Sequence, residues 1–309
     1  MKLKHYGIAL VPVCLAAFLF RAVELILGID PRTGYFATDS LLPILFDGFL
    51  ILAALFFCTV LFTVKKEPKP TAVRLYRASI LDTIFGIAGS VLLVTEALYG
   101  FFSGIADGTV GFNVSLLLNP ALWKLVLSLL AAIFLIFFVT YPKRSAKQNG
   151  WRIMSLSISL YYLFLLIVNF RDSDVVFSRA FGIYLICFYG IAAAAGINFS
   201  KILARLFGRK AFTLFTCLMT VLSAVRLADA VLYLIPGNPY AIPMNLFGFL
   251  ADVCITVLLL SQMKKVMLNR KKRLIEESTE QVQTAESSEE RIQAAEESAK
   301  GADASVVSE

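Results

Sequence analysis

Histidine is nearly missing from this chain, which has a single one, His5, close to its start. The sequence also has no HExxH, GxSxG or SxxK motif and no glycine-rich phosphate loop. These absences exclude a zinc metalloprotease, a Ser-His-Asp hydrolase and a pump that hydrolyses ATP at its own phosphate loop. Because no catalytic motif remains, we expect the protein not to be an enzyme and to use no cofactor.

Paired cysteines and strand-like segments are missing as well. The five cysteines all lie inside apolar segments, and none has CxxC spacing. This is typical of small buried side chains, so we predict neither a disulfide framework nor a metal site. No apolar segment shows the period-two alternation of a β-strand. The cysteines are Cys14, Cys58, Cys187, Cys217 and Cys254.

Apolar residues, by contrast, make up 58% of the 309 residues, and the mean hydropathy is +0.76. That is too apolar for a soluble domain of this length. A membrane-spanning helix needs roughly 20 predominantly apolar residues, and eight segments satisfy this requirement. We therefore predict an all-α integral membrane protein of eight helices. The predicted spans are about 6–28, 42–64, 78–102, 119–141, 151–170, 178–199, 211–235 and 243–263.

Basic residues are distributed unevenly between the two sides of these spans. The N-terminus and the four segments after every second span carry 21 Lys and Arg, whereas the alternate loops hold only Arg32, Arg171 and Arg179. By the positive-inside rule, we predict a multi-pass protein of the cell membrane with both termini in the cytoplasm. The partner that we expect for the basic loops is anionic lipid at the inner face, and not nucleic acid. No feature indicates an oligomeric state.

The C-terminal segment 266–309 is first basic and then acidic. From Ile275 onward it holds ten acidic and two basic residues, a net charge of −8, which leaves +15 on residues 1–274. The segment has no aromatic residue and too few large apolar residues to form a core. We therefore predict a polytopic membrane domain over 1–265 and a cytoplasmic tail over 266–309 that is disordered or a frayed helix.

The eight spans are predicted to form four hairpins, and two sequence matches suggest that a hairpin is repeated. The segment ELILG at 24–28 aligns with EALYG at 96–100, and PILFDGFL at 43–50 aligns with PMNLFGFL at 243–250. Proline in the first turn suits a helix start, because its missing N–H has no helical partner there. An internal hairpin repeat is one interpretation, and the shared composition of membrane helices is the other.

Most ionisable residues inside the spans lie toward the outer ends, although Asp252 lies near the middle of its span and Asp82 on the inner side. Each costs about 2.5–3.5 kcal/mol at the centre of a spanning helix, so such residues indicate ion pairing or function. Arg21 and Glu24 are three residues apart, and so are Arg226 and Asp229, so each pair is predicted to share a helix face and neutralise itself. The candidate solute or proton site comprises Arg21, Glu24, Asp47, Glu96, Lys124, Arg226, Asp229 and Asp252.

These charges leave several functions open. The function that we predict is the binding or transport of a small polar or charged solute in an outward-facing charged cavity, whose carboxylates can take up protons. The alternative is a non-transporting scaffold or sensor that acts through cytoplasmic partners, with purely structural buried charges. A membrane enzyme that acts on lipid through Asp and Glu is a third interpretation, but it lacks a nucleophile and a metal cluster.

The segment DPRTGYF, residues 30–36, directly follows the span that bears Arg21 and Glu24. In this arrangement the chain resembles uncharacterised multi-pass membrane proteins of Gram-positive anaerobic bacteria. The resemblance covers the first hairpin and implies no activity.

Overall fold

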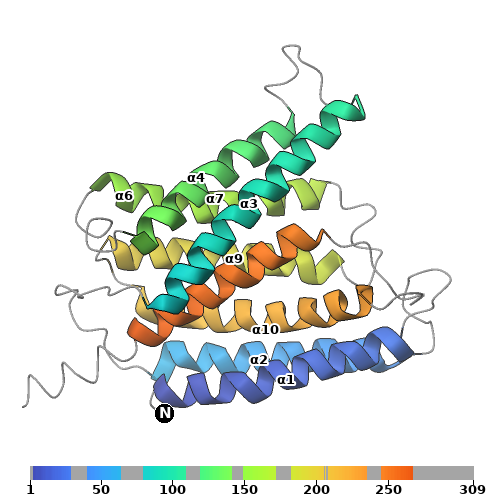
Figure 1. Ribbon diagram of the computed structural model, residues 1–309. Helices are drawn as coiled ribbons and strands as arrows, with labels where there is room; N and C mark the ends of the chain where they lie inside the picture. Colours follow the sequence, from blue (N-terminus) through green and yellow to red (C-terminus); the bar gives the residue numbers. More distant parts are fainter. Residues whose placement is uncertain are drawn as a thin grey trace, which may run out of the picture. The chain divides into compact units, whose positions relative to one another are not determined.

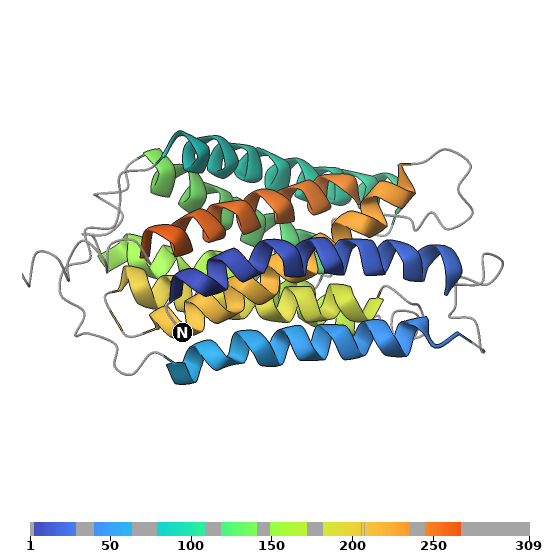
Figure 2. The ribbon, with the colours of Figure 1, turned by 90° about the horizontal axis from the view of Figure 1, so that it is seen from below.

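The computed structural model is helical throughout the residues that it describes (Figures 1 and 2). The chain divides into two units, Met1–Lys264 and Lys265–Glu309. Almost all of the second unit lies outside the described residues, so the nature of the acidic tail stays a prediction. The described residues are 3–28, 40–63, 79–108, 119–140, 149–171, 182–204, 206, 208–234 and 245–266.

Seven helices of the described part are long and apolar enough to cross a membrane. This confirms the prediction of an all-helical, multi-pass membrane protein, and no described residue lies in a strand. The helices begin and end within a few residues of the predicted spans. They are α1 (Leu3–Leu27), α2 (Leu42–Thr63), α3 (Ile80–Ala106), α4 (Pro120–Thr140), α9 (Gly182–Leu203), α10 (Arg209–Tyr233) and a last helix, Leu246–Val266.

The predicted span 151–170 differs from the others because it is not one helix. A turn at Ser155 separates the short α6 (Asn149–Met154) from α7 (Leu156–Arg171). With 16 residues, α7 alone covers about 24 Å, which is less than the roughly 30 Å of a bilayer's hydrocarbon core. Serine hydroxyls compete with the backbone for hydrogen bonds, and Ser155 lies at the break. An apolar run without glycine or proline carries no other signal of this interruption.

Polar residues just before several helices explain where these helices begin. Ser79 and Asp82 form a capping box at the start of α3, in which the Ser79 backbone N–H donates to Asp82 Oδ2 at 2.8 Å. Asn119 Oδ1 accepts a hydrogen bond from the N–H of Ala121 at 2.9 Å, and Pro120 is the first residue of α4. These caps satisfy backbone donors that a helix start would otherwise leave without partners.

The helices pack side by side, and several neighbours are distant in sequence. Helix α1 packs on α2 and α10, α9 packs on α7 and α10, and α4 packs on α3 and α7. In Figures 1 and 2, α1 and α2 lie on one side of the bundle and α3 and α4 on the other. The last helix contacts α3, because a Cβ at Gly89 would lie 3.2 Å from Cys254 Cβ. Whether the hairpins are repeats of one another stays a prediction.

Large apolar side chains cover the outside of the bundle. Phe62 is 84% exposed, Ile80 is 81% exposed and Val11 is 70% exposed, all within apolar helices. Soluble monomers rarely expose contiguous apolar surface of this kind, whereas lipid tails solvate it readily. The buried side of the same helices carries both apolar and charged residues, and these charged residues form the candidate site.

Candidate functional site

The candidate charged side chains form three groups in one half of the bundle, and all of them are buried except the exposed Asp47 and the half-buried Lys124. This half adjoins the end at which α1 stops, which we call the Leu27 end. The groups contain all eight candidate residues from the sequence and draw side chains from all eight of the longest described helices. They are the Arg21 group (Arg21, Glu24, Asp47, Tyr184 and Asp229), the Arg226 group (Tyr162, Arg226 and Asp252) and the Glu96 group (Glu96, Lys124, Tyr161 and Asn245).

The Arg21 group joins α1, α2, α9 and α10. Arg21 Nη1 donates to Glu24 Oε2 at 2.8 Å, and Arg21 Nε donates to Asp229 Oδ1 at 2.9 Å. Arg21 Cζ lies 4.7 Å from the centre of the Tyr184 ring, in cation–π geometry. The Tyr184 hydroxyl in turn donates to Asp47 Oδ1 at 2.8 Å. One fully buried guanidinium therefore connects two helices directly and two more through a tyrosine.

Carboxylates outnumber cations in the Arg21 group. Glu24 and Asp229 both bind the single guanidinium of Arg21, and Asp47, which is exposed, accepts from Tyr184. The Glu24 side chain is fully buried, and its Oε1 has no hydrogen-bond partner among the residues that the structure describes. A buried polar atom without a partner costs free energy, and a charged one costs more. Of the three groups, the Arg21 group is therefore the one in which a buried carboxylate oxygen has no partner among the described residues.

The Arg226 group is a neutral pair enclosed by aromatic rings. Arg226 Nη1 on α10 donates to Asp252 Oδ2 on the last helix at 2.5 Å, and the Tyr162 hydroxyl of α7 donates to Asp252 Oδ1 at 2.9 Å. Both oxygens of the Asp252 carboxylate are therefore bound. Aromatic ring centres lie 4.5–5.8 Å from Arg226 Cζ, and they belong to Phe188, Tyr189 and Phe249.

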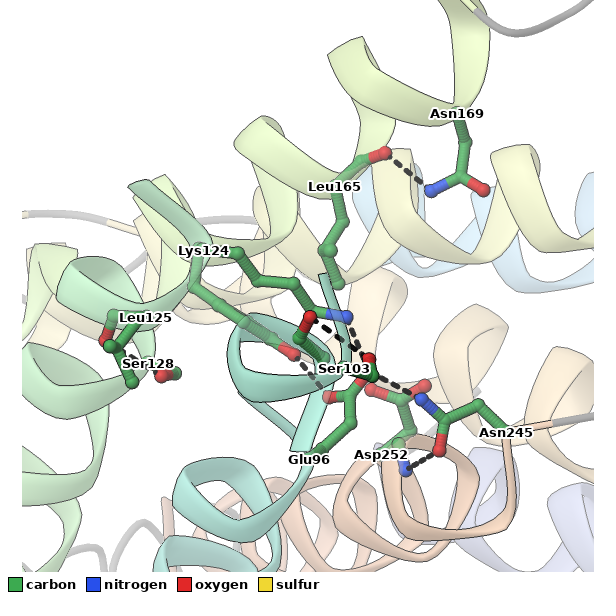
Figure 3. A network of polar contacts seen from close by, with 12 residues as sticks. Glu96, Ser103, Lys124, Leu125, Ser128, Leu165, Asn169, Asn245 and Asp252 are labelled. Atoms are coloured by element: carbon green, nitrogen blue, oxygen red, sulfur yellow. Dashed lines mark hydrogen bonds and ion pairs between the residues drawn. The ribbon is translucent and has the colours of Figure 1, made fainter. Parts of the chain in front are cut away.

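The Glu96 group joins α3, α4, α7 and the start of the last helix (Figure 3). Glu96 Oε1 accepts from Lys124 Nζ at 2.5 Å and from Asn245 Nδ2 at 3.0 Å, and Glu96 Oε2 accepts from the Tyr161 hydroxyl at 3.1 Å. Gly248 leaves room for this carboxylate, because a Cβ there would lie 2.9 Å from Glu96 Oε1. Three donors from three different segments thus hold one carboxylate in place.

A cavity of about 270 Å³ lies next to the Glu96 group, between α3, α4 and α7 at the Leu27 end. Of the eight candidate residues, only Lys124 lines it. We expected all eight charged residues to line one cavity. The observed cavity has only one of them in its wall. Its other walls include Gly100, Phe101, Phe164, Val168 and Asn169.

One predicted pair is present and another is wrong. Arg21 and Glu24 pair on α1, as their spacing of three residues predicts. Arg226 and Asp229 have the same spacing, but each pairs with a different helix. Arg226 binds Asp252, and Asp229 binds Arg21, 208 residues away in the chain. Spacing along one helix permits a contact but does not decide it when a neighbouring helix offers a better partner.

Four polar residues of these groups were not predicted as site residues: the three tyrosines and Asn245. Tyr161, Tyr162 and Tyr184 each donate a hydroxyl hydrogen bond to a carboxylate of a different group. A tyrosine far from the ends of a span is a signal that could have found Tyr161 and Tyr162, because its hydroxyl needs a partner where no water is available, but Tyr184 lies in the first turn of α9 and carries no such signal. Asn245 carried no comparable signal, since it precedes the last helix like an ordinary capping residue.

In the predicted repeat, the register of Glu24 and Glu96 continues to Asn169 and, within one residue, to Asp229, but these four polar residues do not have equivalent partners. Glu24 and Asp229 both bind Arg21, whereas Glu96 binds Lys124. Asn169 Nδ2 donates to the Leu165 carbonyl of its own helix at 2.8 Å, as Figure 3 shows. Arg32 and Arg179, two of the three basic residues of the alternate loops, lie outside the described residues.

Comparisons of the chain with protein-family models, with curated proteins and with solved structures found no match. The resemblance of the first hairpin to a group of bacterial membrane proteins therefore stays a prediction. Within the described ranges, no three His, Cys, Asp or Glu side chains come together in a way that could hold a metal ion. The three groups and the cavity are therefore the features that indicate a function.

Proposed function

We propose that this membrane protein binds a small polar or charged solute in the Leu27 half of its bundle and transports it across the membrane, with protons exchanged at its buried carboxylates. The unequal distribution of Lys and Arg supports placing the Leu27 end outside the cell and both termini in the cytoplasm. The helix bundle then presents its charged groups closer to the outer surface than to the inner one.

The observation that carries this proposal is the composition of the Arg21 group. Two buried carboxylates, Glu24 and Asp229, share the guanidinium of Arg21, and Glu24 Oε1 is buried without a hydrogen-bond partner among the described atoms. If the group had only to hold the helices together, one carboxylate for the guanidinium would suffice. Ionisable residues within spans commonly mark ion and proton pathways, and an incompletely satisfied carboxylate can accept a proton or the cationic part of a solute.

Thermal stability of the purified full-length protein in detergent tests the proposal. A solute that binds only the folded state raises the melting temperature by mass action. We expect at least one member of a panel of ions, amino acids, sugars and organic acids to raise it, in a manner that depends on pH. Glu24→Gln and Asp229→Asn should reduce this shift.

Asp107→Asn is the matched control, because Asp107 is an exposed carboxylate at the end of α3, away from the three groups. Uptake of the stabilising solute into proteoliposomes then separates transport from binding. No shift with any solute, together with a large loss of stability in both Glu24→Gln and Asp229→Asn, would contradict the proposal.

A second candidate function is a scaffold or sensor whose buried charges are structural. The observation that favours it is that each of Arg21, Lys124 and Arg226 already has a carboxylate partner. Buried ion pairs can specify which helices pack together. Deletion of residues 275–309 distinguishes the two functions, because a transporter should keep its uptake whereas a sensor that acts through this acidic tail should lose its output.

A further inference from the structure

The cavity between α3, α4 and α7 combines apolar walls with a single charged side chain. Its volume is about 270 Å³, which corresponds to about nine water molecules at the roughly 30 Å³ that each occupies in the liquid. Phe101, Phe164, Leu165 and Val168 contribute apolar surface. A ligand that fills this space is therefore small, and most of its surface is apolar.

The charge in the cavity wall is positive. Lys124 lines the cavity, and 26% of its side chain remains exposed although its Nζ binds Glu96. An ammonium group has three N–H donors, and the contact with Glu96 Oε1 uses one of them. The remaining donors can bind an acceptor in the cavity. No acidic residue lines the cavity, and the Glu96 carboxylate, which offsets part of the Lys124 charge, lies outside its lining.

The Glu96 carboxylate does not depend on Lys124 alone. Asn245 Nδ2 donates to its Oε1 at 3.0 Å, and the Tyr161 hydroxyl donates to its Oε2 at 3.1 Å. When Lys124 turns part of its hydrogen bonding toward a ligand, these two donors keep Glu96 satisfied and in position. The ammonium can thus bind Glu96 and an incoming anion at the same time.

A second polar group lies on the opposite wall. Asn169 lines the cavity from α7, and one of its amide N–H groups donates to the Leu165 carbonyl at 2.8 Å. A primary amide has two N–H donors, so the second one is available to a ligand oxygen. A carboxylate has two oxygens and accepts from a cation and a neutral donor together, which matches the pair of Lys124 and Asn169.

We propose that this cavity binds a small apolar monocarboxylate, whose carboxylate contacts Lys124 and whose apolar body lies against Phe101, Phe164 and Val168. The inference rests on the proposed function, because it names the class of solute that the protein takes up. It excludes cationic and sugar-like solutes from this cavity, since the wall offers a positive charge and few hydrogen-bonding groups.

Hexanoate is the probe, with hexanamide and hexylamine as matched neutral and cationic compounds. We expect the melting temperature of the purified full-length protein in detergent to rise with hexanoate concentration and not with the other two. The shift should be lost in Lys124→Gln. Because this variant leaves Glu96 without its cation and can fold poorly, Gly100→Leu provides an independent test.

Gly100 lines the cavity, and a Cβ placed there would meet no heavy atom within 4 Å. A leucine at this position therefore fills the cavity while Lys124 and Glu96 keep their contact. Gly100→Leu should abolish the hexanoate shift without lowering the melting temperature of the unliganded protein. Gly48→Leu is the control, since Gly48 on α2 also has open space around it, does not line this cavity and should leave the hexanoate shift unchanged.

Three results would overturn this inference: no shift with hexanoate, an equal shift with hexanamide, or a hexanoate shift that persists in Gly100→Leu. If a different solute then raises the melting temperature and Glu24→Gln abolishes that shift, the proposed function is supported and only the assignment of a monocarboxylate is contradicted. If no solute of the panel raises the melting temperature, both the proposed function and the monocarboxylate assignment are contradicted.

Discussion

Tyr161 and Tyr162 are neighbours on α7, and their hydroxyls donate to carboxylates of two different groups. Tyr161 reaches Glu96 on α3 at 3.1 Å, and Tyr162 reaches Asp252 on the last helix at 2.9 Å. Consecutive residues of an α-helix point about 100° apart, because the helix has about 3.6 residues per turn. A single turn of α7 therefore connects the Glu96 group with the Arg226 group.

The Tyr161 hydroxyl is expected to stabilise the fold. Hydrogen bonds to charged groups contribute about 1.5–3 kcal/mol, so Tyr161→Phe should lower the free energy of unfolding by an amount in this range. The measurement is denaturation of the purified protein in detergent. Tyr99→Phe on α3 is the control, because the Tyr99 side chain is 68% exposed and its replacement should have little effect. Equal losses in the two variants would argue against a structural role for the Tyr161 hydroxyl.

Arg226 and Asp252 should show strong coupling. Removal of one partner of a buried ion pair typically costs about 3–5 kcal/mol, since the other charge is left unpaired. Arg226→Met should therefore destabilise the protein strongly. The double variant Arg226→Met, Asp252→Asn should be less destabilised than Arg226→Met alone, because the neutral amide still accepts from Tyr162. A double-mutant cycle measures this coupling, and additive losses would mean that the pair contributes nothing as a unit.

Gly248 and Gly48 occupy aligned positions in the predicted repeat, but they should respond differently to alanine. A Cβ at Gly248 would lie 2.9 Å from Glu96 Oε1 and 3.0 Å from Glu96 Cδ, whereas a Cβ at Gly48 meets nothing within 4 Å. Overpacking costs typically about 1–3 kcal/mol, so Gly248→Ala should lower the melting temperature. Gly48→Ala should keep or raise it, because alanine is the better helix former. A comparison of the two melting curves is sufficient, and a stabilised Gly248→Ala would contradict the close packing of Glu96.

Gly196 is expected to be essential for the close approach of α7 and α9. A Cβ at Gly196 would lie 2.6 Å from Ser159 Oγ and 3.3 Å from the Ser159 backbone nitrogen, and the backbone cannot move aside without separating the helices. Gly196→Ala should therefore lower the melting temperature. Gly190→Ala on the same helix is the control, since its Cβ would meet Leu166 at 3.9 Å, an ordinary van der Waals distance. If both variants melt alike, the two helices have room that the structure does not show.

The sequence by itself determined which segments are helices and that they belong in a membrane. Runs of about 20 apolar residues match the thickness of the hydrocarbon core, and the requirement that every backbone group be hydrogen-bonded in lipid leaves helices as the solution for such runs. Pro43 and Pro120 lie in the first turns of α2 and α4, as predicted. The break at Ser155 escaped prediction because the apolar pattern continues across it.

Only the tertiary structure decided which charges meet. The sequence indicated the eight ionisable residues and placed all of them except Asp252 toward one end of the bundle, and spacing along a helix predicted the Arg21 and Glu24 pair. The same spacing failed for Arg226 and Asp229, because their partners Asp252 and Arg21 lie on other helices. Spacing determines which side chains share a face of one helix. The neighbour that faces them follows from how all the helices pack together, and this packing depends on contacts between segments far apart in the chain.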